Sequence, residues 1–256
     1  MQEIILETKN LSKTFSTHGV QQHVLKNLNV TIKKGDFTVI MGSSGGGKST
    51  LLYALSGMDN PTLGSVIYSE NGKKVDIAKY SQDQLSVFRR NHCGFVFQQI
   101  YLVDTMSIMD NILISGMLVN KKKSIVIRRA EELLNAVGLQ KELWNKFPNQ
   151  LSGGEAQRAG MVRAVINQPD ILFADEPTGA LNSNNAKLVL NVMTKVNETG
   201  QSIVMVTHDI ASALRGNRIL YLRDGIIEGE CQLGLYEEEN KERKKELKLF
   251  LEDMGW

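Results

Sequence analysis

The segment GSSGGGKST, residues 42–50, combines the residue types that a phosphate-binding loop needs. Its glycines, Lys48 and Ser49 stand at the G-x-x-x-x-G-K-S spacing, between a run typical of a strand and a run typical of a helix. In such a loop the backbone N–H groups point toward phosphate oxygens, Lys48 reaches the β and γ phosphates, and Ser49 offers its hydroxyl to Mg²⁺. A flexible serine–glycine linker is the alternative, but it leaves the register of strand, loop and helix unexplained. We therefore predict a nucleotide phosphate site formed by Gly42, Ser43, Ser44, Gly45, Gly46, Gly47, Lys48, Ser49 and Thr50.

Two carboxylates directly follow the apolar run at 171–174. Asp175 and Glu176 are expected at the carboxyl end of a buried strand, where open α/β sheets place their ligands. Asp175 is positioned to hold the Mg²⁺ shell, and Glu176 can polarise an attacking water and accept its proton. Two solvated loop acids are the alternative, which does not explain their place after an apolar strand. The pair predicts nucleotide hydrolysis.

A second candidate anion site is the helix start LSGGE, residues 151–155. Ser152 and Glu155 form an S-x-x-E capping box. Between them, Gly153 and Gly154 each cost about 1 kcal/mol relative to alanine inside a helix. Because a helix N-terminus attracts anions, the bare backbone here predicts the close approach of a phosphate. An ordinary capped helix is the alternative, and it leaves the paired glycines unexplained.

Short apolar runs that alternate with helix-forming segments must position these residues. Near-continuous apolar strands alternating with helices predict an α/β fold with a parallel sheet buried on both faces. The expected strands are 4–8, 24–32, 37–41, 64–68, 74–77, 94–97, 171–175, 202–206 and 218–222. The expected helices are 48–56, most of 81–168, 184–198 and a short helix after Asp209.

The composition is that of an ordinary globular protein. Of 256 residues, 42% are hydrophobic and 23% charged, with a formal net charge of +2, so no global charge draws it to nucleic acid or to acidic membranes. The apolar run 112–119 is far shorter than a membrane span, and Glu3 and Glu7 interrupt any signal-peptide pattern. We expect that the chain does not cross a bilayer by itself.

Taken together, GSSGGGKS, LSGGE, ILFADEP and VTHD resemble, in that order, the motifs of an ABC-type ATPase across about residues 3–230. The resemblance implies a P-loop NTPase (RecA-like) core with an N-terminal antiparallel β subdomain and an inserted helical subdomain. It places the ABC ATPase domain at 1–232, its helical subdomain at about 99–165, and a C-terminal tail at 233–256.

The same resemblance implies a head-to-tail dimer with two ATP molecules between the chains. Ser152, Gly153 and Gly154 of one chain would then meet the γ-phosphate of ATP held by the loop 42–50 of the other. The glycines allow backbone N–H groups and the helix dipole to face that phosphate. A homodimer is the simpler expectation, because Glu176 and His208 are both present.

Further roles follow from the resemblance, position by position. Gln98 matches the glutamine that contacts Mg²⁺ and the attacking water, so the implied metal ligands are Ser49, Gln98 and Asp175. His208 matches the histidine that contacts the γ-phosphate and supports Glu176. Phe15 aligns with the aromatic that stacks on adenine; a core aromatic is the alternative. Asn182 departs from the family's usual aspartate and loses its negative charge, which leaves the coupling of the two sites in doubt.

The segments LSGMDNPTLGSV and DEPTGALN resemble the ATPases of lipoprotein-release, macrolide-export and antimicrobial-peptide-resistance transporters. This implies a separately encoded membrane permease, a place on the cytoplasmic face of the cell membrane, and no nucleic-acid partner. The permease contact would lie at an apolar patch that could equally seal the subdomain's own core: Ile100, Tyr101, Leu102, Val103 and Met106.

Two other classes of function remain. A soluble ABC-type ATPase acting on ribosomes or nucleic acid would share every motif. Such proteins usually carry two ATPase halves or a long coiled-coil insertion, and in addition a basic nucleic-acid face, whereas this sequence has one half, no heptad run and a net charge of only +2. A regulatory nucleotide-binding module would not need Glu176 or His208.

Two surface segments complete the sequence-based expectations. Leu247, Phe250, Leu251 and Met254 share one helical stripe, which predicts a terminal helix folded onto its own domain; a docking helix for a partner is the alternative. The run 121–123 consists of lysines and indicates a solvated helix start, with contact to anionic lipid as the alternative.

Overall fold

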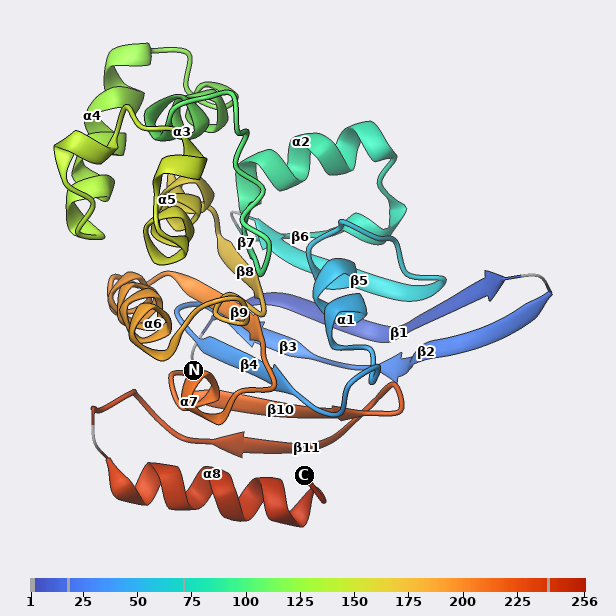
Figure 1. The fold of residues 1–256 in the computed structure, drawn as a ribbon. Helices are drawn as coiled ribbons and strands as arrows, with labels where there is room; N and C mark the ends of the chain where they lie inside the picture. Colours follow the sequence, from blue (N-terminus) through green and yellow to red (C-terminus); the bar gives the residue numbers. More distant parts are fainter. Residues whose placement is uncertain (1–2, 18, 71, 239) are drawn as a thin grey trace. The chain divides into compact units, whose positions relative to one another are not determined.

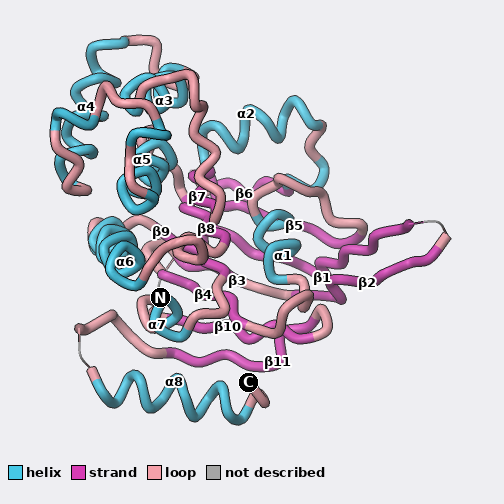
Figure 2. The backbone as a smooth tube through the Cα atoms, in the orientation of Figure 1, coloured by secondary structure: helices cyan, strands magenta, loops and turns pink. Residues whose placement is uncertain are grey.

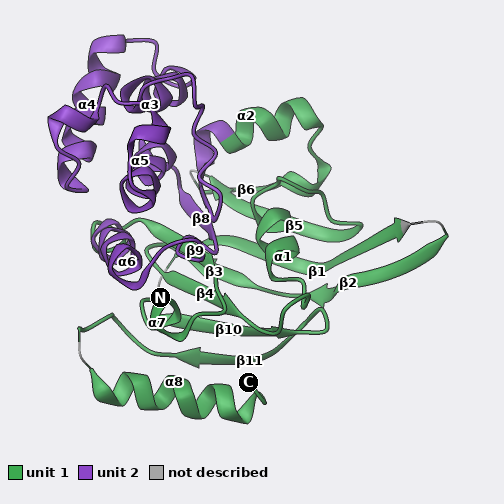
Figure 3. Cartoon of the chain, viewed as in Figure 1, with its two compact units in different colours: residues 1–89, 197–256 green, residues 90–196 purple. Residues whose placement is uncertain are grey.

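The computed structural model describes residues 3–17, 19–70, 72–238 and 240–256. Its backbone contacts divide the chain into two compact units (Figure 3). Unit 1 comprises residues 1–89 and 197–256, and unit 2 comprises residues 90–196. Two helices cross these limits along the chain, α2 (Gln82–His92) and α6 (Ser183–Glu198).

Unit 1 contains a parallel core of three strands, labelled in Figure 1. They are β4 (Phe37–Met41), β9 (Ser202–Val206) and β10 (Arg218–Arg223), and β4 pairs in parallel with each of the other two. Every residue of β4 and β9 is buried, as expected for strands covered on both faces. β11 (Ile226–Gln232) adds an antiparallel edge to β10, α1 (Lys48–Leu55) packs near β9, and α7 (Ile210–Ala213) follows β9.

The same unit also contains an antiparallel sheet. Its strand order is β2-β1-β5-β6, and β3 also pairs with β1. The strands are β1 (Ile4–Thr17), β2 (Val20–Leu28), β3 (Thr31–Lys33), β5 (Leu63–Glu70) and β6 (Lys73–Asp76), followed by the 3₁₀ helix η1 (Ile77–Lys79). Leu6 of β1 faces Tyr68 of β5 across the ladder, and both side chains are buried.

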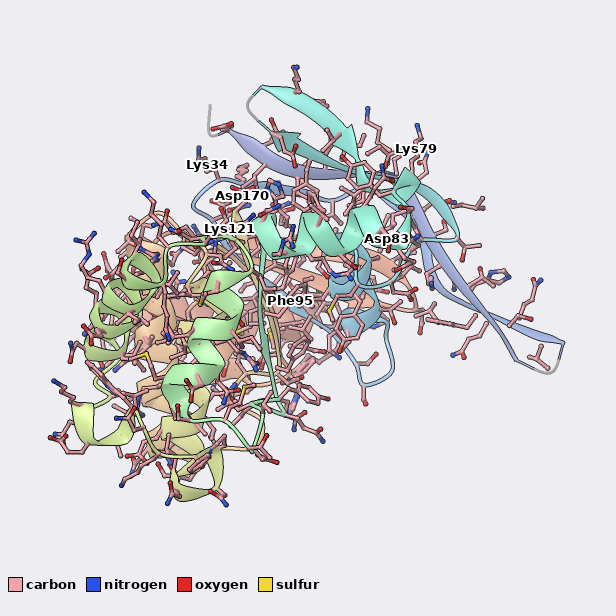
Figure 4. All side chains as sticks on the ribbon, turned by 90° about the horizontal axis from the view of Figure 1, so that it is seen from above. Lys34, Lys79, Asp83, Phe95, Lys121 and Asp170 are labelled. Carbon is pink, nitrogen blue, oxygen red and sulfur yellow. The ribbon has the colours of Figure 1, made fainter. Side chains whose placement is uncertain are left out.

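Unit 2 consists of two parallel strands and a group of helices (Figure 2). β7 (Cys93–Phe97) and β8 (Ile171–Asp175) pair so that Phe95, labelled in Figure 4, faces Phe173, with ring centroids 5.9 Å apart. The helices are α3 (Ile108–Met117), α4 (Lys123–Ala136) and α5 (Gly153–Val165), with 3₁₀ helices η2 (Lys141–Leu143) and η3 (Pro148–Gln150) between α4 and α5. α5 packs against α3, α4 and β7.

The tail forms helix α8 (Lys241–Asp253), which packs on unit 1. Leu247 and Leu251 are buried, and the Phe250 ring meets Tyr221 of β10 edge to face at 6.5 Å between centroids. The buried guanidinium of Arg243 donates hydrogen bonds to the carbonyl oxygens of Leu214 (2.8 Å) and of the segment that precedes the helix. The apolar stripe of the tail therefore covers strands of its own chain.

The α/β class with an antiparallel sheet and a helical insert is confirmed. β1 extends to Thr17, well beyond the expected 4–8, because pairing with three strands supports residues whose own pattern is polar. The expected helical subdomain, 99–165, falls inside unit 2, and the contact division keeps the tail with unit 1. Across the described ranges, no helix combines the length and apolar character that a bilayer crossing requires.

Candidate nucleotide site

The glycine loop in unit 1 follows β4 directly and leads into α1. Gly42 has a φ of +146°, and a Cβ at this position would stand 1.9 Å from the carbonyl oxygen of Leu222 on β10. Gly47 has a φ of +94°, and its Cβ would stand 3.0 Å from the carbonyl oxygen of Val24. The loop is thus built against neighbouring backbone with no room for side chains at these two positions.

Lys48 begins α1 and is only 9% exposed. Its ammonium donates hydrogen bonds to the carbonyl oxygens of Gly42 (3.0 Å) and Ser43 (2.8 Å), so the charge is held inside the curve of the loop. The N-cap residue Gly47 supplies no side-chain cap, and the first turn carries no acid. Together these features leave a positive helix end beside a buried ammonium, an environment suited to phosphate.

Phe15 lies on β1 and is 41% exposed, so it is not a core residue. The Lys13 ammonium stands 5.0 Å from the centroid of its ring. A flat, accessible ring flanked by a cation is suited to stacking with a base.

Asp175 ends β8, whose preceding residues are buried, and Glu176 follows with a φ of +47°. This left-handed conformation is costly for a side chain other than glycine, by about 1–2 kcal/mol, and such strain clusters at functional sites. A turn bond from the Gly179 N–H to the Glu176 carbonyl oxygen (3.1 Å) supports it. The structure therefore fixes the direction of Glu176 by backbone geometry.

Gln98 follows β7 and packs against the turn that contains Glu176. A Cβ on Gly179 would stand 3.0 Å from Nε2 of Gln98. The side-chain amide of Gln157 links the segment before Gln98 to the turn after Glu176. Its Nε2 donates hydrogen bonds to the carbonyl oxygens of Phe97 and Pro177, each at 2.9 Å. Gln157 is 2% exposed, and its importance was missed from the sequence.

Two further residues on the same face of α5 hold the segment after Gln98. The Arg163 guanidinium donates to the carbonyl oxygens of Ile100 (2.8 Å) and Tyr101, and burial lowers its pKa. Gly160 leaves room for Ile100, whose Cγ2 would stand 2.9 Å from a Cβ there. These residues and β7 line a shallow pocket. The spacing 157, 160, 163 places these residues near one face of a helix, but it does not show which segments that face contacts.

The helix start at Ser152 has the predicted capping box. The Ser152 N–H and hydroxyl donate to Oε2 of Glu155 at 2.8 and 2.7 Å, and the Glu155 N–H donates to the Ser152 hydroxyl at 3.4 Å. The hydrogen bond from the Ser152 side chain, followed by the one from its backbone, lowers the pKa of Glu155. This carboxylate is committed to the cap.

The two glycines of this helix start differ. Gly154 is buried, and a Cβ there would stand 2.6 Å from Cγ of Asn185 on α6, so packing within the chain explains it. Gly153 is exposed, and its nearest neighbour would be Cδ2 of Leu181 at an ordinary 3.4 Å. Packing therefore accounts for Gly154, whereas Gly153 lacks a packing reason within unit 2, and the phosphate contact at both glycines stays a prediction.

Asn182 caps α6, because its Oδ1 accepts a hydrogen bond from the Asn185 N–H at 3.0 Å. Asparagine and aspartate are equally good N-caps, so the departure from aspartate keeps the local structure. In unit 1, His208 is exposed and follows β9. The next residue, Asp209, caps α7 by accepting from the Ser212 N–H at 2.7 Å, which fixes the backbone on one side of His208.

The candidate residues are divided between the units. Unit 1 supplies the loop 42–50, Phe15 and His208, whereas unit 2 supplies Gln98, the pair 175–176 and the helix start 152–154.

The expected Mg²⁺ ligands Ser49, Gln98 and Asp175 are oxygen donors, which Mg²⁺ prefers. No group of three or more His, Cys, Asp or Glu suited to a metal occurs among the described residues. Mg²⁺ is usually bound by one or two carboxylates together with substrate phosphates. This donor set fits a Mg²⁺ that is bound jointly with a nucleotide.

Comparison with known proteins places these features in a family. The sequence profile described as "ABC transporter" matches residues 25–179. The lipoprotein-releasing system ATP-binding protein LolD of Aquifex aeolicus is 42% identical over 226 residues, which cover 88% of this chain and 97% of LolD. The macrolide export ATP-binding/permease protein MacB of Campylobacter fetus is 36% identical over 244 residues, which cover 95% of this chain but 37% of MacB.

A solved structure shares the fold. It is the dimeric, post-hydrolysis state of the ATP-binding cassette MJ0796 of Methanocaldococcus jannaschii, bound to ADP and Pi. The TM-score is 0.78 with 36% identity, covering 89% of this chain and 98% of that one.

Proposed function

This chain belongs to the ABC transporter family as an ATP-hydrolysing subunit, and we propose that two copies of it close head to tail around two ATP molecules. The observation that carries this proposal is the exposed Gly153 at the tip of a capped helix. The dimeric state of the related MJ0796 cassette supports it.

In this arrangement the loop 42–50 and Lys48 hold the phosphates, and Phe15 stacks on adenine. The tip 152–154 of the partner copy faces the γ-phosphate with backbone N–H groups. Glu176 accepts a proton from the attacking water, with His208 and Gln98 orienting the reacting groups. Ser49, Asp175 and Gln98 would hold Mg²⁺, which when bound neutralises charge on the phosphates.

Complementation between two inactive variants tests the head-to-tail arrangement. Lys48→Ala damages the loop, and Ser152→Arg blocks the helix tip. In a mixed dimer, the intact loop of the Ser152→Arg chain meets the intact tip of the Lys48→Ala chain, so one whole site is restored. We expect ATP hydrolysis to reappear on mixing. No recovery, with mixed dimers demonstrated by cross-linking, would overturn the arrangement in trans.

A second variant separates binding from chemistry. Glu176→Gln should retain ATP binding and form an ATP-dependent dimer, while turnover falls roughly 10²-fold or more, as expected for a lost general base. Sedimentation velocity with and without ATP measures the dimer. Near-normal turnover would remove Glu176 from the role of base.

We further propose that the dimer drives a separate permease at the cytoplasmic face of the membrane, for lipoprotein release or for export of peptides or macrolides. The names of LolD and MacB support this class, and MacB carries a permease in the same chain. The patch that follows Gln98 supports the contact, because Tyr101 and Val103 are exposed and Arg163 fixes the backbone at Ile100 and Tyr101.

Val103→Lys tests this contact without touching the nucleotide residues. We expect the purified subunit to hydrolyse ATP normally, but to lose co-purification with the membrane protein encoded next to it. Glu142→Lys adds the same side chain at another exposed position of unit 2 and serves as the control. Undiminished co-purification of the Val103→Lys chain would place the permease elsewhere.

A further inference from the structure

We propose that the turn between α3 and α4 binds the surface of an anionic lipid bilayer directly. This contact goes beyond the ATP-dependent dimer and needs neither nucleotide nor permease. It rests on the charge, exposure and helix-capping pattern of residues 111–130 in unit 2. Figure 1 shows the turn between the ends of the two helices.

The segment 111–130 contains no acidic residue. Its basic residues are Lys121, Lys122, Lys123, Arg128 and Arg129, which give a formal charge of +5 in a chain whose total is +2. The arginines are engaged, since Arg128 approaches Glu132 at 3.9 Å and Arg129 donates to the Ile166 carbonyl oxygen at 2.8 Å. The lysines are exposed, and within the described ranges their ammonium groups have no ion-pair partner; Lys121 is labelled in Figure 4.

Exposed apolar side chains accompany these lysines. Leu118 is 59% exposed and Ile114 49%, and Met117, Val119 and Ile125 are exposed as well. The two helix ends meet closely, because a Cβ on Gly116 would stand 2.3 Å from Cγ1 of Val126. Ile114, Met117 and Leu118 stand at i, i+3 and i+4, so they lie on one face at the end of α3. Large apolar side chains gathered beside unpaired lysines are typical of a surface that lies at a membrane interface.

The lysines do not stabilise α4, the helix at whose start they stand. α4 begins at Lys123 with Lys122 as N-cap, without a side-chain cap and without an acid in its first turn. Cations at a helix N-terminus oppose the helix dipole, so this charge pattern weakens α4. Anionic headgroups beside the turn would reverse that effect, because they compensate both the lysines and the helix end.

Vesicle flotation with the purified full-length chain tests the proposal. We expect binding to vesicles of phosphatidylcholine with about one-third phosphatidylglycerol, and none to phosphatidylcholine alone. Raising the salt from about 0.1 M to about 0.5 M should release the protein, because the Debye length shortens from about 10 Å to about 4 Å. Failure to bind the anionic vesicles at low salt would overturn the proposal.

Two variants locate the contact. K121Q/K122Q/K123Q should weaken binding roughly 100-fold, at about fivefold for each lysine removed. K241Q/K244Q/K245Q removes the same charge from exposed positions of α8, where acids alternate with lysines, and should leave binding within about threefold. If both variants lost vesicle binding equally, net charge alone would explain the effect, and the assignment of the contact to this turn would be wrong.

The apolar half of the surface needs its own variant. L118S/V119S keeps every lysine and should weaken binding about tenfold through lost apolar burial. Normal ATP hydrolysis by each variant shows that it is folded, so a failure here is separate from a failure of the dimer. Lysine-dependent binding to the permease in detergent, without binding to vesicles, would assign the surface to a protein and overturn a lipid partner.

Discussion

The loop 42–50 and the helix tip 152–155 are both candidate phosphate sites, yet the two are built in different ways. In the loop, Gly42 and Gly47 are required by neighbouring backbone in the same unit. At the tip, Gly154 is crowded by the side chain of Asn185, whereas Gly153 faces open space apart from an ordinary contact with Leu181. The loop is a closed cradle with its own buried cation, and the tip is an open surface.

This difference shows which of these glycines is explained by contacts within the chain itself. The Lys48 ammonium already has loop carbonyls within 3.0 Å, so the cradle is formed before any second chain is considered. The tip offers a capped helix end with an exposed glycine, and no contact within unit 2 requires a glycine at that position. A requirement at Gly153 must then come from a molecule outside unit 2.

The largest effect is expected from Gly42→Ala. The added Cβ would stand 1.9 Å from backbone at Leu222, so the loop must move, at a cost above about 2 kcal/mol. We expect ATP affinity to fall by 100-fold or more, measured by equilibrium binding to the isolated chain.

Gly45→Ala is the matched control, because Gly45 also has a positive φ, of +76°, but no neighbouring atom within 4 Å of its Cβ. This variant should lose far less affinity than Gly42→Ala. Equal losses would mean that backbone strain alone, and not the close approach of Leu222, sets the glycine requirement.

The next effect separates the two glycines of the tip. Gly154→Ala should lower the free energy of unfolding by about 1–2 kcal/mol, because its Cβ meets Asn185. Gly153→Ala should leave stability unchanged or raise it by up to about 1 kcal/mol, yet lower turnover about tenfold by crowding the phosphate donated by the other chain.

Denaturant unfolding and steady-state ATP hydrolysis measure these two quantities separately. If Gly153→Ala were as unstable as Gly154→Ala, the tip would be an ordinary packed helix start. If it were stable and fully active, the open surface would have no role in hydrolysis.

Local patterns made the cradle and the cap predictable from the sequence, and distance along the chain explains what was missed. The loop 42–50 and the Ser152–Glu155 cap are each encoded within a few residues. The packing partner of Gly154 is Asn185, and the amide of Gln157 reaches both Phe97 and Pro177. Such contacts depend on which helices become neighbours, and no residue pattern within one segment contains that information.

The strands show the same limit. The buried strands β4, β8 and β9 were predicted with their observed bounds, because unbroken apolar runs mark them. β11 was not predicted: its sequence, IIEGECQ, has a glycine at its centre and depends on pairing with β10. The glycine at position 229 is explained by the fold, because Phe250 of α8 and Met254, which directly follows that helix, lie against it.

A smaller effect is expected at Asn182, which caps α6, the helix whose Asn185 packs against Gly154 at the tip. Asn182→Ala removes the cap of α6 and should lower the free energy of unfolding by about 1 kcal/mol, whereas Asn182→Asp should change it by only a few tenths. Thermal unfolding of the nucleotide-free chain measures both. Unchanged stability in Asn182→Ala would contradict the capping role.

The smallest effect is a pH dependence that only the tip should show. The Ser152 hydrogen bonds lower the pKa of Glu155 below its ordinary value of 4.5, so the folded state favours the carboxylate. Stability from this pair is therefore fully present above the unfolded-state pKa and is lost as the pH falls through the lower, folded-state pKa.

Ser152→Ala should lower the free energy of unfolding by about 1 kcal/mol at pH 7, and by less in acid. In a Glu155→Gln background the effect of Ser152→Ala should not vary with pH, since glutamine keeps the capping geometry without titrating. A pH-dependent difference that persists in that background would locate the titrating group elsewhere than at the tip.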